Sequence, residues 1–323
     1  MGALPKEKIM KTLLTLLLML SFATVQGAYT VRNGKLVNTK TIATQPAPDH
    51  YNDAVTAHEA GNWKEAARQF RIVAENFPAH ELCSDATFFL GVAEYKAGEL
   101  DFANEAFNQY IKNKGSSKHF QEAVQYKLQI ADDLAGGARR RMFATKQLPK
   151  WAPGKDLSAQ IYDEVIAAVP SNDLAAKALY AKGQMQWDQG EYKSSITAFQ
   201  MLTKRFPKHE LAPEAYVAIS QVYVDESGDE FHNPDALAFA QINLRRFKQD
   251  FPKEKRIAQV EQDIVAIQEN FANVLYKQGQ FYERTNRSKA AAIYYQKAIS
   301  QFPNTKKADE CRVRLTQIDP KDT

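Results

Sequence analysis

The sequence has few of the residues that build small covalent or fibrous folds. Only Cys83 and Cys311 occur among its 323 residues, and they lie near opposite ends. The chain therefore has no disulfide framework and no CxxC metal or redox motif. Glycine and proline, with 14 and 13 residues, are too sparse for a low-complexity or fibrous protein. The net charge of +4 is small, and no basic stripe follows one helix face, so we expect no nucleic acid partner.

A long apolar run is also missing, except at the N-terminus. There, three lysines precede LLTLLLMLSFA at 13–23, and small residues precede Ala28. This order is typical of a cleaved secretory signal, which we predict at residues 1–27. A membrane-spanning helix needs about 20 apolar residues, and the chain turns polar sooner. A membrane span is the alternative, and Met10 is an alternative start.

Residues 28–48 are predicted to form a flexible arm and linker. Asn33 and Gly34 stand between apolar residues and predict a hairpin turn. The following stretch is rich in threonine and proline, which favours a linker; a tether for a peptide partner is the functional alternative. Ala28 stands where a bacterial lipoprotein has its acylated cysteine, so we expect no direct lipid anchor.

From residue 49 one pattern of residues recurs along the chain. A small residue is followed by a glycine or asparagine, then by alanine or serine, then by an aromatic residue and a proline. Four copies fit well, and they contain Gly61, Ala66 and Phe70; Gly91, Gly98, Ala103 and Phe107; Gly183, Gly190, Ser195 and Phe199; and Gly279, Asn286, Ala291 and Tyr295. Small residues allow two helices to approach closely, the turn residue accepts positive φ, and proline ends the second helix.

This spacing resembles the tetratricopeptide repeat. Because one such unit cannot bury its apolar face, neighbouring units must stack. We therefore predict an all-α fold, a tetratricopeptide-repeat solenoid of five to six helical hairpins plus a C-terminal capping helix, over residues 49–318, with a tail at 319–323. Two weaker pairs of helices complete the series, and one of them is split by a basic insert at 135–155.

Motifs for chemistry are mostly missing. His80 and His209 each begin the sequence HEL, but neither continues to the HExxH motif of zinc proteases. Glu81 and Glu210 are expected instead to stabilise the start of the next helix. No P-loop, GxGxxG or GxSxG motif occurs. We expect no catalytic residues, no metal and no cofactor, and hence not an enzyme.

Surface recognition is the remaining class of function. In tetratricopeptide solenoids the first helix of each hairpin lines a groove that receives a peptide. The matching candidates for peptide or protein binding are Tyr51, Val55 and His58; Phe88, Val92 and Tyr95; and Gln125, Gln129 and Asp132. For Phe88, Val92 and Tyr95, packing on the neighbouring repeat is the alternative.

The predicted secretory signal occurs together with two repeat segments, FPAHELCSDATFFLGVAEYKAGELDFANEAFNQYI and RFPKHELAPEAYVAISQVY. In the signal and in the style of these segments, the chain resembles the BamD family (also called YfiO or ComL). BamD is a component of the outer-membrane β-barrel assembly machinery. The resemblance implies a periplasmic scaffold whose N-terminal repeats receive unfolded outer-membrane proteins and whose C-terminal repeats dock the β-barrel insertase. The chain departs from the family at Ala28, and at Tyr294, near the place of a docking arginine.

Three hypotheses follow for the function. The first is a BamD-like periplasmic scaffold, held at the outer membrane through its partners. The second is another cell-envelope tetratricopeptide adaptor that coordinates cell-wall synthesis or division. The third, an exported enzyme or solute-binding protein, requires a buried polar constellation that the sequence does not show.

Overall fold

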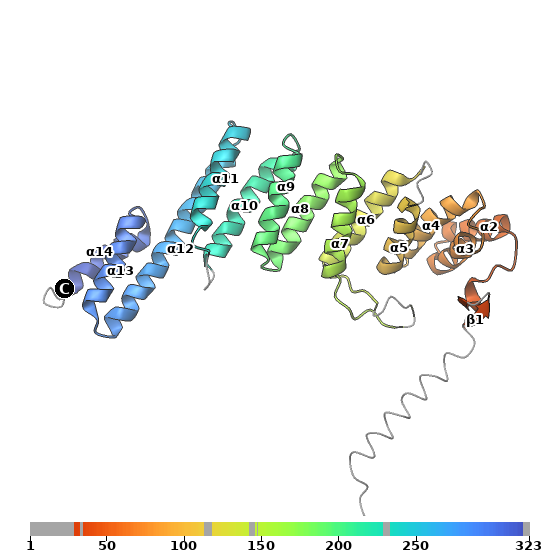
Figure 1. Ribbon diagram of the computed structural model, residues 1–323, viewed down its shortest axis with the longest axis horizontal. Helices are drawn as coiled ribbons and strands as arrows, with labels where there is room; N and C mark the ends of the chain where they lie inside the picture. Colours follow the sequence, from red (N-terminus) through yellow and green to blue (C-terminus); the bar gives the residue numbers. More distant parts are fainter. Residues whose placement is uncertain are drawn as a thin grey trace, which may run out of the picture. The chain divides into compact units, whose positions relative to one another are not determined.

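The structure is a computed structural model that describes residues 29–32, 35–112, 118–141, 146, 148–228 and 233–318. The predicted signal sequence and the predicted tail lie outside the described residues. Apart from one short strand pair, the regular elements of the described residues are helical (Figure 1). None of these helices is long and apolar enough to cross a membrane.

The described residues form thirteen α-helices, which follow one another as six hairpins and a final helix. The hairpins are α2 (Ala47–Glu59) and α3 (Trp63–Asn76), α4 (Leu82–Lys96) and α5 (Leu100–Lys112), α6 (Phe120–Ala135) and α7 (Lys155–Ala168), α8 (Asp173–Asp188) and α9 (Tyr192–Arg205), α10 (Leu211–Gly228) and α11 (Ala236–Asp250), and α12 (Ile257–Arg284) and α13 (Ser288–Gln301). The last helix is α14 (Lys306–Gln317). The predicted all-α class, with six hairpins and a cap, is confirmed.

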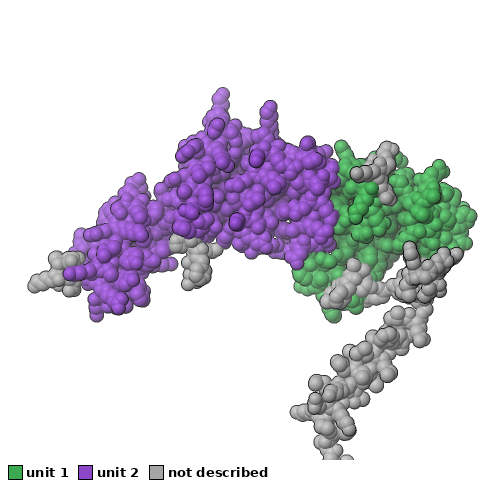
Figure 2. Space-filling view, in the orientation of Figure 1, with its two compact units in different colours: residues 1–130, 138–154 green, residues 131–137, 155–323 purple. Residues whose placement is uncertain are grey.

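The chain divides into two units, which Figure 2 shows in different colours. Unit 1 comprises residues 1–130 and 138–154, and therefore holds α2 to α5, most of α6 and the basic insert. Unit 2 comprises residues 131–137 and 155–323, and therefore holds the end of α6 and α7 to α14.

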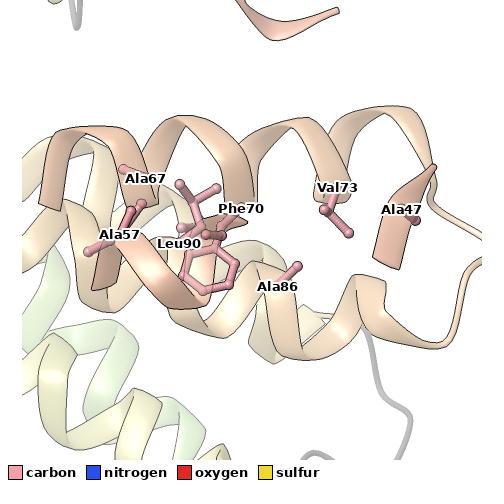
Figure 3. Close-up of a cluster of buried hydrophobic side chains, with 11 residues drawn as sticks. Ala47, Ala57, Ala67, Phe70, Val73, Ala86 and Leu90 are labelled. Carbon is pink, nitrogen blue, oxygen red and sulfur yellow. The ribbon is translucent and has the colours of Figure 1, made fainter. Parts of the chain in front are cut away.

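The first core of unit 1 shows how neighbouring hairpins stack. Phe70 and Val73 of α3 are buried against Ala86 and Leu90 of α4, and Ala57 of α2 lies in the same cluster (Figure 3). The alanines are small, so the helix backbones approach closely and the larger side chains fill the remaining space. The second helix of one hairpin thus covers the first helix of the next.

Within the hairpins, glycine makes the closest helix approach possible. A Cβ atom added to Gly91 would lie 2.7 Å from the ring of Phe107, and one added to Gly183 would lie 2.7 Å from the ring of Phe199. Gly279 faces Tyr295 in the same way. These contacts confirm the repeat register predicted from the sequence.

The turns between paired helices also follow that register. Gly98 and Gly190 have φ values of 71° and 73°, and Asn286 has 55° at the equivalent turn. This left-handed region costs glycine nothing, and asparagine adopts it more readily than most residues. The expected turn positions are therefore confirmed.

The N-terminal arm contains the predicted hairpin. β1 (Tyr29–Arg32) pairs antiparallel with β2 (Lys35–Asn38), with Arg32 opposite Lys35. The predicted turn residues, 33 and 34, lie outside the described residues. The strand pairing confirms the hairpin.

The segment after the hairpin differs from a free linker. Nε2 of His50, a buried side chain, accepts hydrogen bonds from the backbone N–H groups of Thr44 and Gln45, at 3.1 and 3.2 Å. Nδ1 of His50 lies 2.7 Å from Oε1 of Gln69, and Asn76 donates to the carbonyl of Thr41 at 2.8 Å. Side chains of the first hairpin supply the partners of this backbone, so the segment is held against α2 and α3.

The longest helix was not apparent from the repeat pattern, which assigns no element to residues 253–273. In the structure α12 is a single helix of 28 residues. No glycine or proline interrupts residues 257–278, and Val260, Ile264 and Ile267 are buried at helical spacing. The first half of α12 therefore belongs to the core formed with the preceding hairpin, and only its second half belongs to the last repeat.

The first prediction tests the glycine contact at the centre of the fourth hairpin. Gly183→Leu introduces four carbons where Phe199 already fills the space. Overpacking of about 3 kcal/mol should exceed the helix-propensity gain of about 1 kcal/mol, so we expect a net loss of about 2 kcal/mol in unfolding free energy. Urea denaturation measures this loss. The control Gln200→Leu adds an apolar residue at an exposed position of α9; equal stability of both variants would contradict the register.

The second prediction concerns the one described non-glycine residue with positive φ. Asn286→Gly should raise the unfolding free energy by about 0.5 kcal/mol, because glycine adopts φ 55° without steric strain. Asn286→Ala should lower it by about 1 kcal/mol. In thermal denaturation, the melting temperature should be highest for the glycine variant, intermediate for the protein with Asn286 and lowest for the alanine variant. Any other order would show that the turn has a different conformation.

Candidate protein-interaction surface

The candidate side chains of the first hairpin lie half-buried on one face of α2. Tyr51, Val55 and His58 follow one another at intervals of about one turn. The ring of Tyr51 contacts Phe70 edge to face at a centroid distance of 5.6 Å, and the ring of His58 contacts Trp63 at 5.1 Å. Each residue therefore has one face in the core of unit 1 and another accessible to a partner.

The candidates of the second hairpin are differently placed. Phe88 and Val92 are only 2% and 7% exposed, whereas Tyr95 is half-buried. Phe88 stacks on His119 at 4.3 Å and contacts Tyr110 at 5.5 Å. Packing on the neighbouring repeat, the alternative interpretation, accounts for Phe88 and Val92. Of the three residues, Tyr95 alone offers substantial accessible surface.

The candidates of the third hairpin keep the register of the second. Ala123, Lys127 and Ile130 of α6 are buried, and the side chain of Lys127 contacts the preceding helix α5. In α4, the buried Ala86, Leu90 and Ala93 pack against the preceding helix α3 in the same way.

Gln125, Gln129 and Asp132 each follow one of these buried residues by two and therefore lie at the positions of Phe88, Val92 and Tyr95. All three are exposed. Asp132, which belongs to unit 2, accepts a hydrogen bond from the hydroxyl of Tyr162 at 2.8 Å.

Lys127 is the charged member of the buried face of α6. Its side chain is 1% exposed, and its ammonium group donates to Oδ1 of Asn104 at 2.8 Å and to Oδ1 of Asn108. Buried ammonium groups require such acceptors. This contact joins α5 and the unit 1 part of α6, so Lys127 is a structural residue.

The basic insert, whose role the sequence leaves open, is docked on acidic residues of its own unit. Arg141 donates two hydrogen bonds to the carboxylate of Glu99, both at 2.7 Å. Arg140 lies 3.1 Å from Asp101, and Lys150 lies 3.7 Å from Glu99. The paired Arg140 and Arg141 are thus anchors of the insert.

A second ion-pair group fixes the insert further along. Glu94 of α4 is fully buried, and its Oε1 lies 2.7 Å from Nη2 of Arg71 and 2.6 Å from Nζ of Lys146. Both cations lie over the ring of Phe102, at 5.8 and 4.9 Å from its centroid. The insert therefore contributes a cation that helps to neutralise a buried carboxylate.

The two HEL sequences have a capping role. Nδ1 of His80 accepts a hydrogen bond from the backbone N–H of Leu82 at 3.2 Å, and Nδ1 of His209 accepts from that of Leu211 at 3.1 Å. Each histidine thus satisfies a free donor at the start of the following helix. Among the described residues, no group of three or more histidine, cysteine or acidic side chains could hold a metal ion.

The comparisons with known proteins agree with the repeat geometry. Residues 51–118 and 155–210 match the tetratricopeptide-repeat family, and residues 273–305 match a second tetratricopeptide-repeat description. The chain therefore contains tetratricopeptide repeats, and its fold is a tetratricopeptide-repeat solenoid. Such repeats are scaffolds for interaction with other proteins.

Several solved structures are similar to the chain. The MamA protein has 15% identity and a TM-score of 0.34, with 66% of this chain and 94% of that chain covered. A tetratricopeptide repeat protein from Parabacteroides merdae has 14% identity and a TM-score of 0.36, with 84% and 98% covered. PilW, a widely conserved type IV pilus biogenesis factor, has 13% identity and a TM-score of 0.28, with 83% and 99% covered. No curated protein matches the chain.

The third prediction tests the docking of the insert. Glu99→Gln removes the charge that Arg141 pairs with, and hydrogen bonds to charged groups contribute about 1.5 to 3 kcal/mol. We expect trypsin at neutral pH to cut the insert at least about tenfold faster in this variant. Glu105→Gln, which changes an exposed carboxylate on α5, is the control. Equal cleavage of both variants would contradict the anchoring role.

The same contact predicts the pH dependence of docking. The hydrogen bonds from Arg141 lower the pKa of Glu99 in the folded protein. Their stabilising contribution is therefore present above the unfolded pKa of about 4.3 and is lost as the pH falls through the lower folded value. Hydrogen exchange of the backbone N–H of Arg141, followed from pH 6 downward after correction for intrinsic rates, measures this release.

Proposed function

We propose that the protein is a non-catalytic scaffold of the cell envelope that resembles BamD and binds segments of other proteins through its first repeats. The observation that carries the proposal is the half-buried row Tyr51, Val55 and His58 on α2, to which α4 adds the half-buried Tyr95. These side chains offer apolar and aromatic surface with polar edges, which suits extended or helical segments of varied sequence.

The sequence supports the location of this scaffold. The run at 13–23 with its preceding lysines favours export, and we propose a periplasmic protein held at the outer membrane through its partners. Unfolded outer-membrane proteins and the β-barrel insertase are the partners that the BamD resemblance implies.

One observation favours the second candidate, an envelope adaptor for cell-wall synthesis or division. Tyr294, near the place of the docking arginine in the BamD family, stacks on Tyr282 at a centroid distance of 5.3 Å and an interplanar angle of 9°. A stacked pair of tyrosines offers a carboxylate none of the bidentate hydrogen bonds that arginine offers. A different partner at the last repeat is consistent with this exchange.

The fourth prediction separates the two candidates by their partners. The mature protein is used to capture proteins from detergent-solubilised envelopes, and the captured proteins are identified by mass spectrometry. A BamD-like scaffold recovers the β-barrel insertase in near-stoichiometric amount. Recovery of cell-wall or division proteins without the insertase would support the second candidate and contradict the first.

A variant of the α2 row tests whether this surface holds the client segments. The double substitution Tyr51→Ala and His58→Ala should weaken binding of an unfolded outer-membrane protein peptide about tenfold, since two aromatic contacts are removed. Thr56→Ala, an exposed residue on the same helix, is the control. Thermal denaturation of both variants shows whether the fold is kept, and unchanged peptide binding with an intact fold would contradict the assignment.

A further inference from the structure

The preceding hairpin covers one face of α4, the first helix of the second hairpin. In α4 this face contains Ala86, Leu90 and Ala93, which are buried in one cluster with Phe70 and Val73 of α3 (Figure 3). Aligning Gly183 with Gly91 shows the same burial in the fourth hairpin at two of the three equivalent positions, Ala178 and Met185 of α8. A helix therefore normally lies across this face.

The last hairpin leaves the equivalent face uncovered. Aligning Gly279 with Gly91 places Val274, Gln278 and Phe281 of α12 at the positions of Ala86, Leu90 and Ala93. Ala93 is 0% exposed and its counterpart Met185 in α8 is 4% exposed, but Phe281 is 53% exposed. Gln278 is also exposed, and Val274 is half-buried.

The length of α12 explains the uncovered face. α11 packs on the beginning of α12, where Phe247 and Val260 share a cluster. From Phe247 back to its first residue, α11 reaches a point opposite about residue 271 of the antiparallel α12. Phe281 lies about ten residues, or roughly 15 Å, further along the helix. Within unit 2, α11 therefore cannot cover Phe281.

The charge around this face is almost entirely positive. Lys277 precedes Phe281 by one turn and Arg284 follows it by one turn, so the three side chains share one face of α12. Arg287 and Lys289 follow at the start of α13. None of these four cations forms an ion pair with a carboxylate of the described residues.

The nearby acidic group is already engaged. Glu283 is the one carboxylate among residues 274–289. It accepts a hydrogen bond from the hydroxyl of Tyr295 at 2.7 Å and lies 3.5 Å from Arg314. The cations therefore remain available to a partner.

We propose that this α12 face, defined by Val274, Lys277, Gln278, Phe281 and Arg284, binds an amphipathic acidic helix of a partner protein. The partner lies across α12 as α3 lies across α4. Its apolar side chains cover Phe281, and its carboxylates pair with Lys277 and Arg284. This surface is in unit 2 and is independent of the α2 row in unit 1, so either assignment can fail without the other.

Two peptides based on α3, the helix that covers α4, serve as probes. Residues 62–77 include the buried Ala66, Phe70 and Val73 of α3, together with five charged positions. One peptide carries glutamate at all five positions and the other carries lysine, so their apolar faces are identical. Fluorescence anisotropy measures the binding of each peptide to the mature protein. We expect the glutamate peptide to bind at least about tenfold more tightly than the lysine peptide.

Variants of the full chain locate the binding. Phe281→Glu should weaken binding of the glutamate peptide at least about tenfold, whereas Val265→Glu, an equally exposed apolar position on the same helix, should leave it unchanged. The pair Lys277→Glu and Arg284→Glu should reverse the preference in favour of the lysine peptide. Because these side chains are exposed, circular dichroism and thermal denaturation should show an unchanged fold.

Three outcomes would overturn the proposal. The first is equal binding of the two peptides, or binding of neither. The second is binding that Phe281→Glu does not alter. The third is a self-association of the unlabelled protein, seen by sedimentation velocity, that Phe281→Glu abolishes, because a second copy of the chain would then be the occupant of the face.

Discussion

The close approach of two helices at a glycine is the constraint on which the rest of the structure depends. Where Gly91 or Gly183 faces an aromatic ring, a side chain as small as a methyl group has no room. The aromatic ring fills the space on the other helix, so one contact sets both the distance and the rotation of the pair. Because each hairpin then exposes an apolar face that it cannot bury alone, the contact also makes the stack of hairpins necessary.

Much of the fold could be predicted because these contacts depend on local spacing. The positions of Gly91, Gly98 and Phe107 are enough to predict the helices, the turn and the packing face of one hairpin. The third hairpin shows the limit, because its insert removes the second helix from the expected distance along the chain. The long α12 was missed for a related reason, since a helix shared by two layers has no turn residue in its middle.

The candidate site was less predictable than the fold. Helical spacing places Tyr51 and Phe88 at equivalent positions, but only contacts from distant segments decide their exposure. Phe88 meets His119 at the start of α6, whereas Tyr51 meets only the first core and remains half-buried. The basic insert gave a similar ambiguity. Its arginines could serve either as a binding patch or as anchors, and only the position of Glu99, just before α5, and of Asp101, in its first turn, distinguishes these roles.

The unbroken α12 also has a mechanical meaning. Its 28 residues span about 42 Å, and hydrogen bonds along the helix replace the loop that separates other neighbouring hairpins. A sharp bend at this junction would require breaking hydrogen bonds of the helix, which restrains the orientation of α13 and α14 to α10 and α11. A force applied at the C-terminal end, for example by a bound protein, is therefore passed along α12. The last hairpin then moves together with the rest of unit 2.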